Sequence, residues 1–351
     1  QKIQLFIVTF GLKFAKHYKM GKRPKISVII VNYNGGRWLN NSIESVANQT
    51  YSGFECIIID NGSTDNSLEK IPKLDNRFKV IELNKNTGFA YANNLAVKKC
   101  QGDWIALLNP DAFASSDWLK KLLEATELFP GIKMVGSTQY LAGNNNKFDG
   151  IGDFYHISGL AWRGKHNQSS IGKILEDREV FGPCAAAALY EKKAFLDIGG
   201  FDEKYFCYHE DVDLAFRMRL IGGKCIQKSD AVVYHVSSGI SGKASDFAVY
   251  HGTRNRIWTF VKCMPISGLL LFGIAHILLN FAFIFWSIFR KNRIKPTLRG
   301  VYDGVRGLPI IWKDRKTIQR KVNLIALLKI LTINPIKPLM RGDGSIKIQL
   351  D

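Results

Sequence analysis

The first half of the chain alternates short apolar runs with segments of helical periodicity. Residues 26–31 form a nearly continuous β-branched run, which is typical of a strand buried on both faces. Leu39, Ile43 and Val46 recur at helical spacing behind it, and a second buried run follows soon after. The same order of strand, helix and strand returns further along the chain. The pattern therefore predicts an α/β protein with a parallel sheet and crossover helices.

Polar residues follow each of these predicted strands. The four polar stretches are Asn32–Asn34, Asp60–Asn61, Asn84–Asn86 and Asn109–Asp111. The carboxyl ends of parallel strands meet at one edge of a sheet, and ligands bind beyond that edge. We therefore expect these side chains to form one polar site.

The pattern is less regular between residues 117 and 200. Residues 118–129 have the periodicity of a helix, and residues 181–190 are predicted to form a strand. Gly- and Asn-rich segments between residues 143 and 172 are expected to be loops, and these loops carry Trp162. We interpret them as a pocket wall or lid.

Three carboxylates within four residues, Glu210, Asp211 and Asp213, stand at the start of a predicted helix. Such a run is usually a solvated helix start, and Asp213 is expected to cap this helix. Clustered carboxylates also suit two chemical roles, because their oxygens hold divalent cations and accept protons from a substrate. The cluster is therefore a candidate part of a catalytic site.

Five segments of the chain, in this order, resemble glycosyltransferase family 2. They are Ser27–Asn34, Ile59–Asp65, Asn86–Asn94, Asn109–Asp111 and Gly199–Leu214. The branch that the chain most resembles contains rhamnosyltransferases, and the chain is also similar to galactofuranosyltransferases. The resemblance implies a GT-A fold, which is a Rossmann-like, mostly parallel sheet flanked by helices. It further implies an inverting transfer of a sugar from a nucleoside diphosphate to an acceptor hydroxyl.

The resemblance also implies how the donor is held. The nucleotide-sugar-binding positions are Val31, Tyr33, Asp60, Asn61, Asn86, Gly88, Asn109 and Asp111. Asn61 replaces a second aspartate of many members, and its amide can still pair with uracil or thymine. Asn109 replaces the first aspartate of the family's Asp-x-Asp motif. Asp111 and His235 are the implied ligands of Mg²⁺ or Mn²⁺, which neutralises the departing diphosphate.

On the acceptor side, the resemblance implies that Asp211 is the general base that takes the proton of the acceptor hydroxyl. Glu210 is expected to orient the acceptor or to raise the pKa of Asp211. Gly200, Asp202 and Trp162 are further acceptor-binding candidates. The QxxRW motif of processive members is absent from the sequence, which favours the addition of a single sugar.

The segment from Cys263 to Phe289 contains no Lys, Arg, Asp or Glu and is long enough to span a bilayer. One transmembrane helix over residues 264–289 is therefore an alternative to be weighed. Small and polar residues recur along it at helical spacing, namely Gly273, His276, Asn280 and Ser287. Such a stripe favours a helix that lies in the membrane surface with the stripe facing protein.

The chain is strongly basic, with a formal net charge of +19. Residues 290–351 hold 15 Lys and Arg against four Asp, a net charge of +11. This excess lies beside apolar helices, so we expect an anionic membrane surface, at its cytoplasmic face, rather than nucleic acid as the partner. Six cysteines without a CxxC pair indicate reduced thiols rather than disulfides or a zinc site.

These patterns divide the chain into three regions. Residues 1–24 are an apolar, basic segment with helical spacing that suits a membrane surface. Residues 25–245 are the predicted catalytic domain, with a nucleotide-sugar half at 25–115 and an acceptor half at 116–245. Residues 246–351 are a membrane-associated helical region.

The expected activity is transfer of rhamnose or a similar hexose from a dTDP- or UDP-sugar to a lipid-linked or growing cell-surface glycan. One alternative is a sugar nucleotidyltransferase, which needs a basic glycine-rich loop after the first strand. Asn34–Arg37 is a poor version of that loop. The other alternative is a non-catalytic module that binds membranes or nucleic acid.

Overall fold

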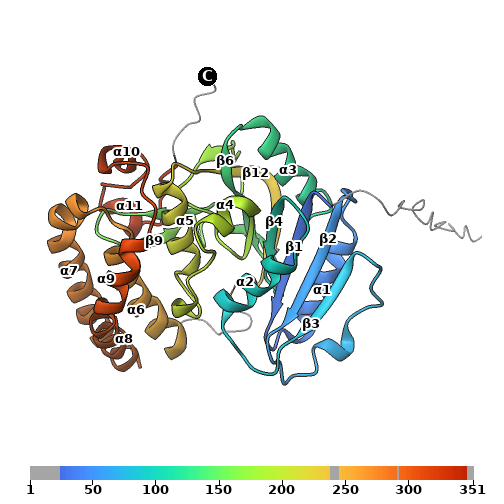
Figure 1. Ribbon diagram of the computed structural model, residues 1–351, viewed down its shortest axis with the longest axis horizontal. Coiled ribbons are helices and arrows are strands. Elements are labelled where there is room, and N and C mark those ends of the chain that lie inside the picture. Colours follow the sequence, from blue (N-terminus) through green and yellow to red (C-terminus); the bar gives the residue numbers. More distant parts are fainter. Residues whose placement is uncertain (1–23, 238–244, 291, 346–351) are drawn as a thin grey trace, which may run out of the picture.

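The computed structural model describes residues 24–237, 245–290 and 292–345. These residues form an α/β domain with a group of helices beside it (Figure 1). The helix expected within residues 1–24 lies outside the described residues.

Among the described residues, a ten-stranded mixed sheet has the order β10-β12-β6-β11-β4-β1-β2-β3, with β5 beside β12 and β7 beside β6. Its strands are β1 (Ile26–Asn32), β2 (Phe54–Asp60), β3 (Phe78–Glu82), β4 (Trp104–Leu108), β5 (Ala112–Ala114), β6 (Ile132–Leu141), β7 (Asn144–Gly150), β10 (Arg178–Glu179), β11 (Ala187–Glu191) and β12 (Lys224–His235). A two-stranded sheet pairs β8 (Asp153–Tyr155) with β9 (Ala161–Arg163).

The strands that lead to the predicted site run in one direction. β1 pairs in parallel with both β2 and β4, and β6 pairs in parallel with β12. β11 lies antiparallel between β4 and β6, so these two strands again share a direction. The carboxyl ends of β1, β2, β4 and β12 therefore lie at one edge of the sheet. The expected α/β fold with a mostly parallel sheet is confirmed.

Two local expectations differ from the structure. The strand predicted over residues 181–190 begins only at Ala187, and Pro183, which has no N–H to donate, lies in the irregular stretch before it. The segment between residues 143 and 172 is not all loop, since it contains β7, β8 and β9. Gly- and Asn-rich composition marked the turns there but hid the short strands between them.

Helices cover both faces of the sheet (Figure 1). They are α1 (Gly36–Ala47) and α3 (Trp118–Leu128) on one face, and α2 (Phe89–Lys99), α4 (Lys192–Asp197) and α5 (Glu210–Leu220) on the other, with short 3-10 turns at Leu68–Lys70 and Glu203–Tyr205. Val28 and Ile30 of β1 join the core with α1 and α3, whereas Ile29 and Val31 join the core with α2 and α5. All of β1 is buried, which explains its continuous apolar sequence.

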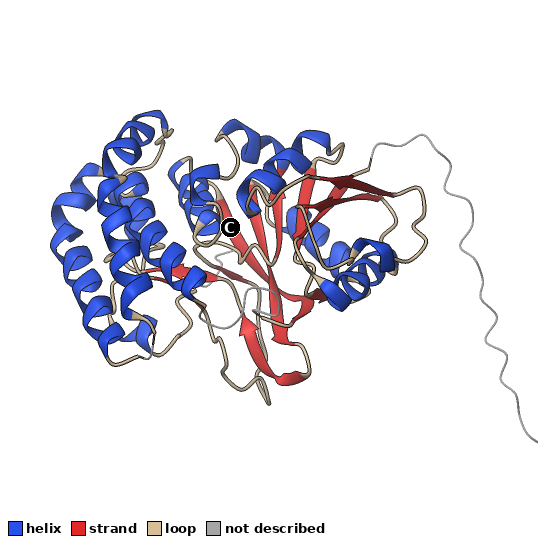
Figure 2. Ribbon diagram, turned by 90° about the horizontal axis from the view of Figure 1, so that it is seen from below, coloured by secondary structure: helices blue, strands red, loops and turns tan. Residues whose placement is uncertain are grey.

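The C-terminal helices form a group beside the sheet, next to α5 (Figures 1 and 2). They are α6 (Asp246–Cys263), α7 (Ile266–Ile288), α8 (Ile294–Arg306), α9 (Leu308–Thr317), α10 (Leu324–Leu328) and α11 (Ile336–Leu339). Phe260 and Cys263 of α6 belong to the same core cluster as α5. α8 approaches α6 closely, because a Cβ on Gly304 would lie 2.8 Å from Ile257 Cδ1.

Helix α7 presents a polar side to the protein and an apolar side to solvent. His276 donates from Nδ1 to the Ser158 carbonyl over 2.8 Å and stacks on Phe260, and Asn280 accepts a hydrogen bond from Arg256. Ser287 is buried as well. The expected polar stripe is confirmed at these three positions. It does not extend to Gly273, which is half-buried and whose missing Cβ would meet open space.

Candidate functional site

The site begins where β4 and β12 end. Asp111 follows β4, and His235 closes β12, which β5 joins by pairing Ala112 with His235. The two side chains are buried, and His235 Nε2 lies 3.2 Å from Asp111 Oδ1. The fold thus brings together two residues that are 124 positions apart in the sequence.

A carboxylate that the sequence did not single out, Asp149 at the end of β7, holds this pair. Its Oδ2 lies 2.8 Å from His235 Nδ1 and 2.5 Å from Arg163 Nη1, and its Oδ1 lies 3.3 Å from His166 Nδ1. Burial raises the pKa of Asp149, but Arg163, His166 and His235 together lower it well below its usual range. No local signal marks Asp149, because it stands in a polar segment and meets its partners only in the folded chain.

The donor atoms of Asp111 and His235 fit a divalent cation. With Asp149 accepting the Nδ1–H, Nε2 is the nitrogen left to bind a metal beside a carboxylate oxygen. Two ligands of one cation at about 2.1 Å and at right angles are about 3 Å apart, which agrees with the observed 3.2 Å. Without a cation, burial lowers the pKa of His235, but the hydrogen bonds with Asp111 and Asp149 raise it to about 9. A bound cation would take the place of the Nε2 proton.

The donor side of the site is organised by Asn61. Its Oδ1 accepts from the Thr87 N–H and hydroxyl, and its Nδ2 donates to Asn86 Oδ1 and to the Gly88 carbonyl. These bonds use both lone pairs and both hydrogens of the amide. The expectation that Asn61 reads the base is therefore not supported, because residues 86–88 already occupy every hydrogen-bonding position of its side-chain amide. The sequence showed the amide but not these partners.

Four other donor-side candidates lie at or near the strand ends. Asp60 is buried and accepts from Asn32 Nδ2 and the Ser63 N–H. Tyr33 is 38% exposed, so its ring is accessible to a nucleotide base. Val31 belongs to the core, and Asn109 is half-buried with its backbone carbonyl bound by the Ser42 hydroxyl. Of these four, Tyr33 is the most exposed.

Gly88 connects the donor side to the acceptor side. Its φ is 86°, in the left-handed region, and a Cβ there would lie 2.6 Å from the Phe206 ring. Only glycine meets both conditions without strain. The residues that precede α2 are thus in direct contact with the residues that precede α5.

Asp211 stands in the first turn of α5 and is anchored by backbone amides. Its Oδ2 accepts from the Ala185 N–H over 3.3 Å, and its Oδ1 accepts from the Val212 N–H over 2.8 Å. Oxygens of Asp211 and Asp153 and the Cys184 sulfur lie within 4.8 Å of one another. Asp153, on β8, is a second carboxylate that the sequence did not reveal.

Burial raises the pKa of Asp211 above its ordinary value, although the two amides favour its ionised form. Burial and the charge of Asp211 raise the pKa of Asp153 to about 8. Asp211 is the member of this pair whose oxygens accept from backbone amides, which favours its ionised form. A carboxylate with a raised pKa is the form that a general base needs.

Glu210 is buried beside Asp211, and its Oε2 has no hydrogen-bond partner among the described residues. Burial, followed by the charge of Asp211, raises its pKa well above the usual range. The burial of Glu210 therefore favours its neutral form next to Asp211.

Asp213 is not a helix cap, contrary to expectation. The residue before α5 is His209, and Asp213 points into the interior, where its oxygens lie 2.6 Å from Arg217 Nη2 and 2.8 Å from Lys262 Nζ. Tyr205 donates its hydroxyl to the same carboxylate. Burial raises the pKa of Asp213, but the two cations lower it to about 2. The sequence placed Asp213 in the first turn but did not show that α6 would supply Lys262.

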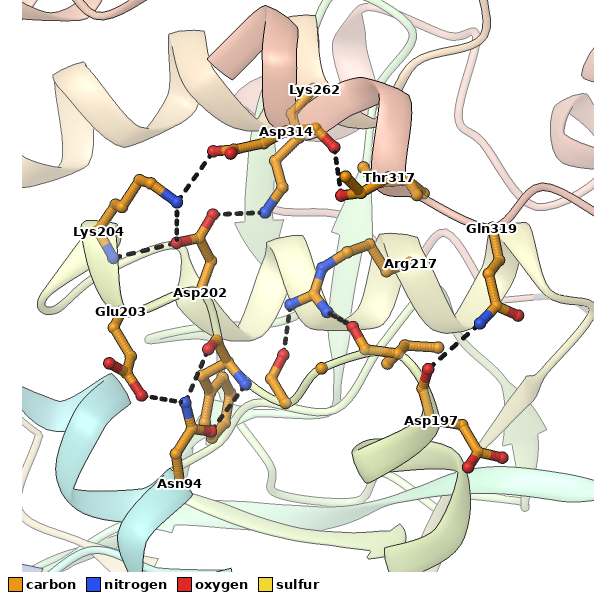
Figure 3. Close-up of a pocket in the computed structure, with 15 residues that line it drawn as sticks. Asn94, Asp197, Asp202, Glu203, Lys204, Arg217, Lys262, Asp314, Thr317 and Gln319 are labelled. Carbon is orange, nitrogen blue, oxygen red and sulfur yellow. Dashed lines mark hydrogen bonds and ion pairs between the residues drawn. The ribbon is translucent and has the colours of Figure 1, made fainter. Parts of the chain in front are cut away.

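The three acceptor-binding candidates do not come together. Gly200 and Asp202 line a polar cavity of about 610 Å³ whose charged groups bind one another, as Asp202 with Lys262 and Lys204 with Asp314 (Figure 3). The lining residues include both cationic partners of Asp213 but not Asp211. Trp162 is buried elsewhere, against Phe154, and donates its indole N–H to the Gly342 carbonyl.

Comparisons with known proteins match the chain to one family. Residues 27–199 match the model of the family described as "Glycosyl transferase family 2". An uncharacterised glycosyltransferase of Haemophilus influenzae is 35% identical over 143 residues, which are 40% of this chain and 44% of the relative. An N-acetylglucosaminyl-diphospho-decaprenol L-rhamnosyltransferase of Mycobacterium tuberculosis is 25% identical over 64% of this chain and 81% of its own length. The chain spans less than half the length of the first curated relatives that it matches.

Solved structures show the same fold. TarS 1–349 of S. aureus, in complex with UDP, has a TM-score of 0.53 with 18% identity and covers 83% of each chain. A mannosyltransferase of Pyrobaculum calidifontis, in complex with GDP-Man and Mn²⁺, has a TM-score of 0.51 with 15% identity over 90% of this chain and 81% of the other. The fold is therefore of the GT-A type.

Proposed function

Because residues 27–199 match the model of glycosyl transferase family 2, we propose that this protein is an inverting glycosyltransferase that adds a single sugar to an acceptor hydroxyl. The proposal rests on the position of Arg163, which links two groups of residues. Its guanidinium binds Asp149, the partner of His235, and its charge also acts on Asp211 and Asp153. The pair Asp111–His235 and the carboxylate Asp211 are thus two parts of one site.

The residues of this site divide the chemistry between them. Asp111 and His235 would hold Mg²⁺ or Mn²⁺, which supplies positive charge to the departing diphosphate when bound. Asp211, held by the amides of Ala185 and Val212, takes the proton from the acceptor hydroxyl as that oxygen attacks the sugar. Asp149 keeps the His235 ring in one orientation.

The donor is rhamnose or a similar hexose on dTDP or UDP, and the acceptor is a lipid-linked or growing cell-surface glycan. The name of the Mycobacterium tuberculosis relative, an N-acetylglucosaminyl-diphospho-decaprenol L-rhamnosyltransferase, supports the sugar and the lipid-linked acceptor. A Bacillus subtilis relative, 36% identical over 29% of this chain, is named as a putative teichuronic acid biosynthesis glycosyltransferase. Tyr33, exposed at the end of β1, offers a ring for the base.

We expect purified protein with Mn²⁺ to release nucleoside diphosphate from one member of a panel of dTDP- and UDP-sugars when a polyprenyl-diphosphate sugar is present. EDTA is expected to abolish this release, because the diphosphate then departs without a counter-charge. Product lipid and released diphosphate are measured by chromatography. Release of pyrophosphate from a nucleoside triphosphate and a sugar phosphate would instead identify a nucleotidyltransferase and refute the proposal.

The C-terminal helices suit a membrane surface at its cytoplasmic face, where sugar nucleotides are available. α7 is long and apolar enough to cross a membrane by length and composition. It is also tied to the protein by His276 and Asn280, which bond to Ser158 and Arg256, and these contacts favour a helix lying in the surface. Its outer side and that of α8 expose large apolar residues, including Leu270, Ile274, Leu278, Phe281, Leu298 and Tyr302. Basic residues border them, including Arg290, Lys295, Arg299 and Arg306, which suit anionic lipid.

Replacing Ile274 and Leu278 together with glutamate is expected to weaken binding to phosphatidylcholine–phosphatidylserine vesicles about 100-fold, because two exposed apolar side chains that would enter the lipid are lost. Sedimentation with vesicles measures the binding. Leu128→Glu, at an equally exposed apolar position on α3, is the control and should bind as the unchanged protein does. Alkaline carbonate should release the protein from membranes, whereas retention would show that α7 spans the bilayer.

A further inference from the structure

The residues just before the proposed base adopt an unusual backbone conformation. In the segment Phe206–His209, here named the catalytic loop, three non-glycine residues have positive φ, namely Phe206 at 65°, Tyr208 at 67° and His209 at 65°. Such values are uncommon for residues with a side chain and persist only when surrounding contacts hold them. Glu210 and Asp211 directly follow the catalytic loop, so its conformation sets where the first turn of α5 begins.

One side chain outside the loop gathers its carbonyl groups. Asn255, on α6, is fully buried, and its Nδ2 donates to the carbonyls of Tyr205, Cys207 and Tyr208 over 3.1, 3.0 and 2.7 Å. These three carbonyls lie within four residues and point to one place, and the left-handed residues Phe206 and Tyr208 lie among them. A primary amide offers only two hydrogens, so one of them is shared between two of the three carbonyl oxygens.

The neighbouring residue on α6 extends the same contact. Arg254 Nη2 donates to the carbonyls of Lys204 and Tyr205, each over 3.1 Å. The imidazole ring of His251, one turn earlier, stacks on the Phe206 ring. Helix α6 therefore holds the backbone from residue 204 to residue 208.

The opposite side of the catalytic loop rests on the donor side of the site. The Phe206 carbonyl accepts from the Ala90 N–H, and the Phe206 ring occupies the space that a side chain on Gly88 would need. Asn61 in turn fixes the Gly88 carbonyl. The catalytic loop thus lies between α6 and the start of α2. A shift of the loop would move Asp211 relative to the sugar donor.

We propose that Asn255 is a positioning residue of the transfer reaction, which sets the orientation of Asp211 through three backbone carbonyls without touching substrate. This inference rests on the proposed function, because it takes Asp211 as the base. It gives a role in catalysis to the buried side chain of Asn255 on α6, which lies outside the matched residues 27–199. The amide acts through the loop, so its loss should change turnover more than donor binding.

The test compares Asn255→Asp and Asn255→Ala with a matched control on the same helix. Asparagine and aspartate have nearly the same shape, but a carboxylate presents oxygens to three carbonyl oxygens. The control is Thr259→Val, since the Thr259 hydroxyl is equally buried but binds the Tyr205 hydroxyl and the Asn255 carbonyl, not the catalytic loop. We expect both Asn255 variants to lose about 100-fold in kcat with little change in donor KM, because small misplacement of a reacting group has effects of that size.

A second measurement does not depend on activity. Hydrogen exchange at the amides of residues 206–211 is expected to accelerate in both Asn255 variants and to stay unchanged in Thr259→Val. If the unchanged protein transfers no sugar, the proposed function fails and this inference falls with it. If the unchanged protein is active and the Asn255 variants keep their kcat, or lose activity only in proportion to their thermal stability as Thr259→Val does, the positioning role is wrong.

Discussion

Replacing Asp211 with asparagine is expected to lower the turnover number about 1,000-fold, because the acceptor hydroxyl then has no carboxylate to take its proton. The amide keeps the shape of the side chain and can still accept from the Ala185 N–H. Binding of Mn²⁺ and of a nucleoside diphosphate should therefore stay within a few-fold of the unchanged protein. Turnover is measured by diphosphate release, and binding by calorimetry.

The pH dependence of kcat gives an independent check of the same assignment. Because burial raises the pKa of Asp211, activity should fall with decreasing pH at a higher pH than an ordinary aspartate would cause. Asp230→Asn, which changes a half-exposed aspartate paired with Lys121 and Lys228, should leave the profile unchanged. Full turnover in Asp211→Asn would assign the base to another group.

Replacing Asp213 with asparagine is expected to reduce the free energy of unfolding by about 3–5 kcal/mol, because it leaves the buried Arg217 without its counter-charge and Lys262 with Asp202 alone. Arg217 and Lys262 are both almost fully buried and both contact this carboxylate. Denaturant unfolding monitored by circular dichroism measures the loss. The exposed pair partner Asp230 is again the control, where the same change should cost less than about 1 kcal/mol.

The contribution of Asp213 has a defined pH window. Its pKa is about 2 in the folded protein and about 3.9 in an unfolded chain. A carboxyl group with a depressed folded pKa stabilises the protein fully above the unfolded value and loses that effect as pH falls through the folded value. The difference in stability between the unchanged protein and Asp213→Asn should therefore shrink between pH 4 and pH 2, and a difference that stays constant there would contradict the ion-pair network.

The local pattern was sufficient to predict most elements and several candidate side chains. The buried run at residues 26–31 became β1, and the polar positions after the strands meet at one edge because parallel strands end there. Asp111 and His235 were proposed together only through the family resemblance, since no periodic pattern links residues so far apart. Their separation of 3.2 Å agrees with that proposal.

Other features depend on contacts that no local pattern encodes. Asp149, Asp153 and Asn255 stand in unremarkable sequence, and each gains its role from partners on other elements. The sequence pointed to Asn61 and Asp213 as candidates, but not to their roles. Asn61 binds Thr87 instead of being free for a base, and Asp213 pairs with Lys262 instead of capping α5.

Periodicity and composition are local properties, so they were enough to predict the order of strands and helices, the polar edge of the sheet and the apolar, basic C-terminal region. The folded chain was needed to show that Asp149 holds His235, that Asp213 neutralises Arg217, and that Asn255 binds the carbonyls before Asp211. Charge pairing and hydrogen bonding act over a few ångströms in space, whatever the distance along the chain.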